Sequence, residues 1–143
     1  MARTVDILLA ILALLAIGLS VERLLAPRAD VSIERVAIEG TPARVFSPPG
    51  ASADDPRPAV VVAHGFAGSQ QLMEPFAVAL ARNGYVAVTF DFLGHGRNPR
   101  PLTGDVTAVE GATRALVRET GKVADYAAAL PETDGRLAVL GHS

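Results

Sequence analysis

Residues 59–69 read AVVVAHGFAGS, a run of small and β-branched apolar residues that passes directly into a glycine-rich loop. An apolar run of this length without polar alternation is typical of a strand that is covered on both faces. Residues 85–90 and 137–140 form two further apolar runs. Stretches with helical periodicity lie between the three runs. Alternating strands and helices predict an α/β fold, with a mostly parallel sheet and helices on both faces.

The helices are predicted from their ends and their periodicity. Glu74-Pro75 is expected to start the first helix, because proline is favoured at the first helical position, and Asn83-Gly84 is expected to close it. The second helix is expected over residues 113–130, where apolar positions recur on one face. Upstream, residues 31–45 predict two short strands joined by a turn.

The N-terminal segment is strongly apolar. Residues 7–19 are all apolar or glycine, and the stretch can be extended to Ala26. A membrane span needs about 20 residues, whereas the apolar part of a signal peptide needs about 7–15. An uncleaved single-pass anchor is favoured over a cleaved signal that would give a secreted protein, and over a buried helix of a soluble domain. The flanking charges do not fix the orientation, and an extracytoplasmic domain is favoured.

Composition excludes several function classes. The chain carries 13 Lys and Arg against 15 Asp and Glu, so it lacks the basic footprint of a nucleic-acid-binding protein. It has no cysteine, which excludes a thiol nucleophile and Cys-ligated metals. Gly94-His95-Gly96 resembles the start of a dinucleotide fingerprint, but Pro99 occupies the position of the third glycine. We therefore expect no cofactor, no metal and no nucleic-acid partner.

Three loops follow the ends of three predicted strands, which is where open α/β sheets bind their ligands. They contain His64, Gly65 and Phe66; Asp91, Gly94 and Gly96; and Gly141, His142 and Ser143. Glycines in the first loop let the backbone turn and present N–H groups, although an ordinary turn would also explain them. Asp91 is expected to hold the second loop rather than to react. Ser143 stands where a strand-to-helix turn would expose its hydroxyl.

Taken in order, the three loops resemble those of the α/β-hydrolase superfamily, most closely its lysophospholipase-like and serine-aminopeptidase-like branch. The resemblance covers roughly residues 30–143, the N-terminal half of that fold. It implies that Ser143 is the nucleophile and that the backbone N–H of Phe66 is one donor of the oxyanion hole. It assigns none of the three histidines as the catalytic base, because the fold places the acid and the histidine after the nucleophile.

The resemblance implies a serine hydrolase that cleaves an ester, thioester or amide through an acyl-enzyme. We expect a membrane anchor or signal segment over residues 1–28 and a partial α/β-hydrolase domain over residues 29–143. A small-molecule or lipid-like acyl compound is the expected substrate. The chain ends at the nucleophile, so we interpret it as a truncated form that is inactive by itself. Two alternatives stay open, a non-catalytic binding module of the same fold and a cofactor-binding α/β protein.

Overall fold

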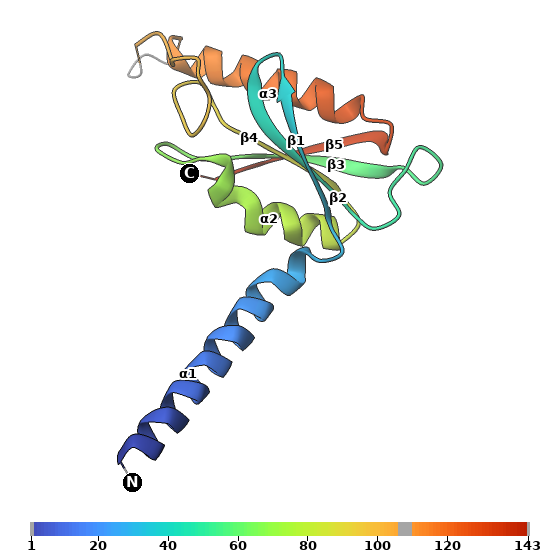
Figure 1. Cartoon of the computed structure of the whole chain (residues 1–143). Coiled ribbons are helices and arrows are strands. Elements are labelled where there is room, and N and C mark those ends of the chain that lie inside the picture. The colour runs from blue at the N-terminus through green and yellow to red at the C-terminus, as the bar shows by residue number, and fades with distance from the viewer. Residues whose placement is uncertain (1, 106–109, 143) are drawn as a thin grey trace.

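The computed structural model describes residues 2–105 and 110–142, which form one α/β domain and a projecting helix (Figure 1). The helical elements are α1 (Ala2–Leu25), the 3-10 helix η1 (Ala26–Arg28), α2 (Gln70–Arg82) and α3 (Ala112–Ala128). The strands are β1 (Ser32–Ile38), β2 (Thr41–Ser47), β3 (Arg57–Ala63), β4 (Val86–Phe90) and β5 (Thr133–Gly141).

The strands form one mixed sheet in the order β1-β2-β4-β3-β5. β3 pairs in parallel with both β4 and β5, whereas β1–β2 and β2–β4 are antiparallel. The predicted parallel sheet is confirmed in this central part. Because β3, β4 and β5 run in the same direction, their carboxyl ends meet at one edge of the sheet.

The two crossover helices cover opposite faces of the sheet (Figure 1). The chain leaves β3 toward α2 and leaves β4 toward α3, so the loops after these neighbouring strands diverge to opposite faces. Such a divergence creates a crevice at the carboxyl ends of the strands. The fold thus places the loops after β3 and β4 at the position where α/β proteins bind their ligands.

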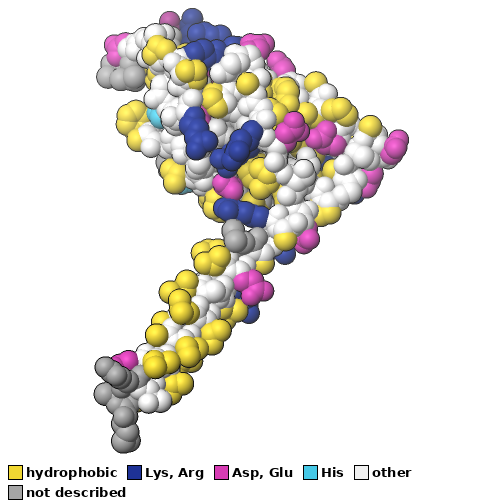
Figure 2. Space-filling view, viewed as in Figure 1, with side chains coloured by type: hydrophobic (Ala, Val, Ile, Leu, Met, Phe, Trp, Pro, Cys, Tyr) yellow, Lys and Arg dark blue, Asp and Glu magenta, His cyan; other side chains and the backbone are white. Residues whose placement is uncertain are grey.

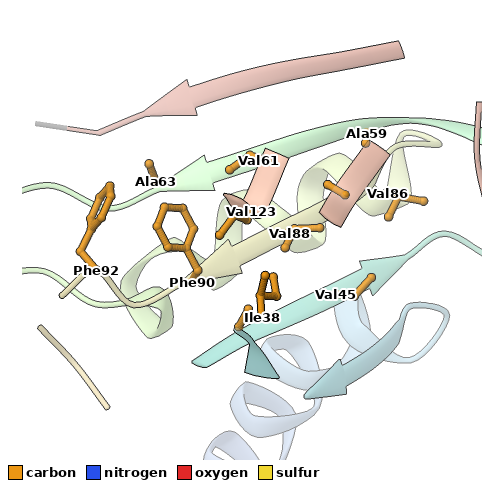
Figure 3. Packing of buried hydrophobic residues seen from close by; sticks show 12 residues of the cluster. Ile38, Val45, Ala59, Val61, Ala63, Val86, Val88, Phe90, Phe92 and Val123 are labelled. Carbon is orange, nitrogen blue, oxygen red and sulfur yellow. The ribbon is translucent and has the colours of Figure 1, made fainter. Parts of the chain in front are cut away.

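The apolar runs are explained by a core on each side of the sheet. Val61, Val88 and Phe90 are fully buried and pack with Val123 of α3 (Figure 3). The intervening residues of β3, such as Val62, pack on the other face with Met73 and Ala77 of α2, among others. Because successive side chains of a strand point to opposite faces, a strand covered on both sides must be apolar throughout.

One helix start was predicted wrongly. The prediction placed Pro75 at the first position of the helix, but α2 begins five residues earlier, at Gln70, and Pro75 lies inside it. Proline there removes one backbone donor to the carbonyl four residues before it. The earlier start is possible because an aspartate far away in the sequence, Asp91, supplies the helix cap.

Helix α1 projects away from the domain and contacts it at the neck formed by η1 (Figures 1 and 2). Its span Thr4–Leu24 has a mean hydropathy of 2.5, and none of it is buried. A helix with an apolar surface all around is typical of a membrane span rather than of the core of a soluble domain. α1 is therefore long and apolar enough to be a membrane anchor or a signal sequence.

Candidate active site

Asp91 is a buried carboxylate that caps helix α2 from the end of the neighbouring strand. It follows β4 and has no solvent-exposed surface. Its Oδ1 accepts the backbone N–H of Gln70 at 2.8 Å, and its Oδ2 accepts the Gln70 side-chain amide at 2.7 Å. Ser69, at the N-cap position, makes no capping hydrogen bond with its side chain. Asp91 therefore satisfies a free donor of the first turn of α2, where a negative charge is also favoured by the helix dipole.

The same carboxylate holds its own loop. Asp91 Oδ2 accepts the backbone N–H of Arg97 at 3.1 Å, and the backbone carbonyl of Asp91 accepts the side-chain amide of Asn98 at 2.9 Å. Gly96 has a φ of +53°, and a Cβ at this position would lie 2.1 Å from Asp91 Oδ1. Only glycine therefore lets the loop close over the carboxylate. At Gly94, whose φ is +72°, an added Cβ would lie 2.9 Å from the Cβ of Leu102.

His64 ties the loop after β3 to the loop after β4. It is only 4% exposed, its Nε2 accepts the backbone N–H of Phe92 at 3.1 Å, and its Nδ1 lies 2.8 Å from the carbonyl oxygen of Gly65. These partners require a neutral ring with the proton on Nδ1. Burial lowers the pKa of His64 below 6.5, and the neighbouring His95 acts in the same direction. Both ring nitrogens are occupied, so His64 has a structural role in this loop.

The loop that carries Phe66 is a tight turn with a free backbone donor. Gly68 N–H donates to the Gly65 carbonyl at 3.0 Å, and Ala67 adopts a φ of +55°, which is strained for a residue with a side chain. The Phe66 side chain is 90% exposed. Within residues 2–105 and 110–142, the backbone N–H of Phe66 has no hydrogen-bond partner. A backbone donor without a partner is one requirement of an oxyanion hole.

The end of β5 lies beside this turn. Gly141 pairs with Ala63 in the sheet, and His142 N–H donates to the Ala63 carbonyl at 3.0 Å. The ring of His142 lies 6.5 Å from that of Phe76 in α2. The predicted nucleophile, Ser143, lies outside the described residues. The register nevertheless brings the residue immediately before it next to the strand end that leads into His64 and Phe66.

Two apolar hollows flank the turn at Phe66. The first has a volume of about 170 Å³ and lies toward α3, where Phe92, His95, Leu102 and Leu116 contribute to its lining. The second, of about 320 Å³, lies toward α2, where Leu72, Met73, Phe76 and His142 contribute. His64, Gly65 and Phe66 line both hollows. Apolar walls around a few polar groups are typical of sites for small organic molecules.

The described residues around these hollows offer no cation site. Within the part of the chain that the structure describes, no three His, Asp or Glu side chains come together in a way that could hold a metal ion. The side chains of Asp91 and His64 are tied into hydrogen bonds of the loops.

A second buried carboxylate, Glu119 of α3, escaped the sequence analysis. It is 2% exposed, contacts the Thr41 hydroxyl and forms an ion pair with Arg100 at 2.5 Å. It therefore anchors the far end of the Asp91 loop to α3 and β2. Gln70 was missed as well, although its place directly after the glycine-rich loop was a usable signal. Nothing local distinguishes Glu119 from the exposed glutamates of the chain.

The sheet order, the divergent loops after β3 and β4, and the sharp turn between β3 and α2 define an α/β-hydrolase fold. The chain belongs to the serine aminopeptidase family S33, whose sequence pattern matches residues 54–143, more than half of its length. It is thus a member of a hydrolase family. No curated protein matches the chain.

Solved structures share the fold. An acetyl xylan esterase from Paenibacillus sp. R4 is 22% identical with a TM-score of 0.64, over 80% of this chain and 42% of that one. TT1662 from Thermus thermophilus is 23% identical with a TM-score of 0.58, over 79% and 47% of the two chains. A thioesterase domain from the curacin biosynthetic pathway is 24% identical with a TM-score of 0.52, over 79% and 37%. The chain therefore spans less than half the length of each.

Proposed function

We propose that this chain carries the nucleophile and the oxyanion-stabilising part of a serine hydrolase that cleaves an ester, thioester or amide through an acyl-enzyme. Ser143 attacks the substrate carbonyl, and a histidine from a segment after the nucleophile accepts the hydroxyl proton. The backbone N–H of Phe66 donates to the oxyanion of the tetrahedral intermediate, together with the N–H of the residue after Ser143.

The observation that carries this proposal is the immobilised, unpartnered N–H of Phe66 beside the end of β5. The turn is held at His64 by its bond to Phe92, and the β5 end is held by the bond from His142 to Ala63. A donor costs no reorganisation during the reaction when its loop is fixed beforehand. The apolar hollows on both sides suit the acyl and leaving-group parts of a small-molecule or lipid-like substrate.

The test is Ser143→Ala in the full-length protein, measured by turnover of p-nitrophenyl acyl esters and by labelling with a fluorophosphonate. We expect turnover to fall by at least about 10⁴-fold and labelling to disappear, because the residue forms the covalent bond. Ser69→Ala is the matched control, since Ser69 lies in the neighbouring turn and makes no capping bond. Labelling of the Ser143→Ala variant would refute the assignment, and a full-length protein without labelling would favour a binding module.

We further propose that α1, within residues 1–28, anchors the domain of residues 29–143 to a membrane, with the domain on the extracytoplasmic side. The support is the length and hydropathy of Thr4–Leu24 and its complete exposure. An intact N-terminus in membrane-extracted protein, measured by mass spectrometry, is the expected result. A soluble product shortened near residue 20 would show that the segment is a cleaved signal instead.

A further inference from the structure

A groove with a surplus of positive charge lies where helix α1 meets the domain. It has a volume of about 520 Å³. Its lining residues come from η1, β1, β2 and α2, and are Arg28, Ile33, Glu34, Arg35, Arg44 and Glu74. We call it the neck groove. Figure 2 shows Lys and Arg side chains on the face of the domain above the projecting helix.

One carboxylate serves two of the three arginines. Glu74 accepts Arg28 Nη2 at 3.1 Å and Arg44 Nη1 at 2.9 Å. Arg35 lies directly opposite Arg44 in the pairing of β1 with β2. Within the described residues the side chain of Arg35 forms no ion pair or hydrogen bond. Like charges opposite one another across two strands destabilise a sheet. The fold therefore tolerates a repulsive pair in the neck groove.

Glu34 does not neutralise this surplus. Side chains alternate along β1, and Val36, which shares a face with Glu34, packs against the core cluster on the α3 side. The charge of Glu34 also helps to raise the pKa of Tyr126, which belongs to α3. The carboxylate of Glu34 is therefore directed to the α3 side of the sheet, whereas Arg44 reaches Glu74 of α2 on the other side.

The position of the neck groove along the chain matches the headgroup layer of a membrane. The 21 residues Thr4–Leu24 extend about 31 Å as a helix, close to the roughly 30 Å thickness of the hydrocarbon core. The three residues of η1 add about 6 Å. Arg28 then lies in the polar layer, which is several ångströms deep. This step rests on the membrane anchoring proposed above, and it does not depend on the hydrolase activity.

We propose that the neck groove binds the phosphate group of an anionic phospholipid from the leaflet next to the domain. Arginine binds phosphate through two parallel charge-assisted hydrogen bonds. At such bidentate contacts arginine is preferred to lysine. A phosphate between Arg35 and Arg44 neutralises the opposed cationic pair, and Arg28 supplies a further donor from the membrane side. The bound lipid also fixes the domain relative to the membrane surface.

The experiment is native mass spectrometry of the intact chain released from a non-ionic detergent and titrated with phosphatidylglycerol. Phosphatidylcholine and inorganic phosphate are titrated in parallel. We expect phosphatidylglycerol to be retained more strongly than phosphatidylcholine, and Arg35→Gln to weaken that retention about five-fold. Arg35 is exposed and unpartnered among the described residues, so the variant is expected to fold. Arg114→Gln is the control, because Arg114 lies on α3 and pairs with Glu110 of the preceding turn.

The outcomes separate the sources of the phosphate. Lipid retention that depends on Arg35, without binding of inorganic phosphate, supports the lipid headgroup. Binding of inorganic phosphate with the same dependence on Arg35 supports a phosphate site that is filled from solution. Equal retention by the wild type and Arg35→Gln, or an equal loss in Arg114→Gln, overturns the proposal. Failure of the hydrolase assignment leaves this result unchanged, and loss of α1 by cleavage is visible in the measured mass.

Discussion

Two polar clusters of the domain differ in how their charges are paired. Around Asp91, one buried carboxylate accepts three N–H donors and binds its own loop to the start of α2. In the neck groove, the carboxylate of Glu74 pairs with two of the three arginines, and the third, Arg35, faces Arg44 across two strands. In the first cluster both oxygens of the Asp91 carboxylate are paired, although the amide oxygen of Gln70 beside it is buried without a partner. In the second, the side chain of Arg35 has no partner among the described residues. A paired carboxylate explains a rigid loop, whereas the unpaired arginine is the basis of the proposed phosphate site.

At the crevice, some polar groups hold the loops, whereas others are left without a hydrogen-bond partner. A buried charge is tolerated when hydrogen bonds compensate for its lost hydration. Asp91 is held in this way, and the neutral ring of His64 has a partner at each nitrogen, so both side chains are occupied by hydrogen bonds. Among the described residues near them, the N–H of Phe66 and the buried amide oxygen of Gln70 are left without a partner. Asp91 and His64 thus support the loops around the proposed site.

The largest expected effect comes from removing the Asp91 carboxylate. Asp91→Ala leaves the two buried donors of Gln70 and the partly buried N–H of Arg97 unpaired, so we expect the free energy of unfolding to fall by about 3 kcal/mol or more. Urea unfolding followed by circular dichroism measures this change. Asp54→Ala is the control, because Asp54 is exposed. If the free energy of unfolding falls no more than in the control, Asp91 does not hold its loop to the start of α2.

Gly96→Ala tests the same cluster from the backbone. A Cβ would lie 2.1 Å from Asp91 Oδ1 at a φ of +53°, so we expect a loss of about 2–3 kcal/mol in the free energy of unfolding. Gly121→Ala is the matched control, because a Cβ in the middle of α3 would meet nothing within 4 Å. That control is expected to gain up to about 1 kcal/mol, since alanine is the better helix former. Equal effects of the two substitutions would contradict the predicted clash.

The link between the loops after β3 and β4 is also expected to weaken in acid, because it depends on His64. Its pKa is lowered in the folded protein by burial, so the unfolded chain binds the proton more readily. The contribution of His64 to stability is therefore present above pH 6.5, the ordinary value, and is lost as the pH falls toward the folded-state pKa. Protonation would place a hydrogen on Nε2 of His64, which could then no longer accept the hydrogen bond from the N–H of Phe92.

Unfolding free energies measured between pH 7.5 and pH 5 give the slope that tests this prediction. His64→Asn is expected to reduce the slope, because asparagine does not titrate in this range. His142→Gln, at the end of β5, serves as the control and is expected to keep it. Stability that increases toward pH 5 in the wild type would show that the buried ring is not held in the neutral form.

The sequence predicted the parts of this architecture that depend on neighbouring residues. The apolar run of residues 59–63 indicated a strand covered on both faces, and the turns after β3 and β4 were visible from their glycines. The start of α2 was missed, because its cap, Asp91, lies 21 residues away from Gln70. Glu119 was missed for the same reason, since its partner Thr41 is 78 residues away. Contacts between distant residues leave no local pattern.

The smallest expected effect has the opposite sign and belongs to the neck groove. Arg35→Gln removes one member of the opposed arginine pair, so we expect the free energy of unfolding to rise by about 0.2–1 kcal/mol. Arg114→Gln is expected to lower it by about 0.2–1 kcal/mol, because that substitution breaks an exposed ion pair between Arg114 of α3 and Glu110 in the preceding turn. Both are measured by urea unfolding of the intact chain in non-ionic detergent.

Addition of phosphatidylglycerol sharpens this last test. A ligand that binds the folded state stabilises it more when it binds more tightly, so the lipid should stabilise the wild type more than Arg35→Gln and cancel the advantage of the variant. A variant that is less stable than the wild type without lipid would mean that Arg35 contributes a favourable contact. If Arg35→Gln is more stable than the wild type without lipid but not with it, Arg35 serves lipid binding at a cost to stability. Asp91, in contrast, stabilises the fold.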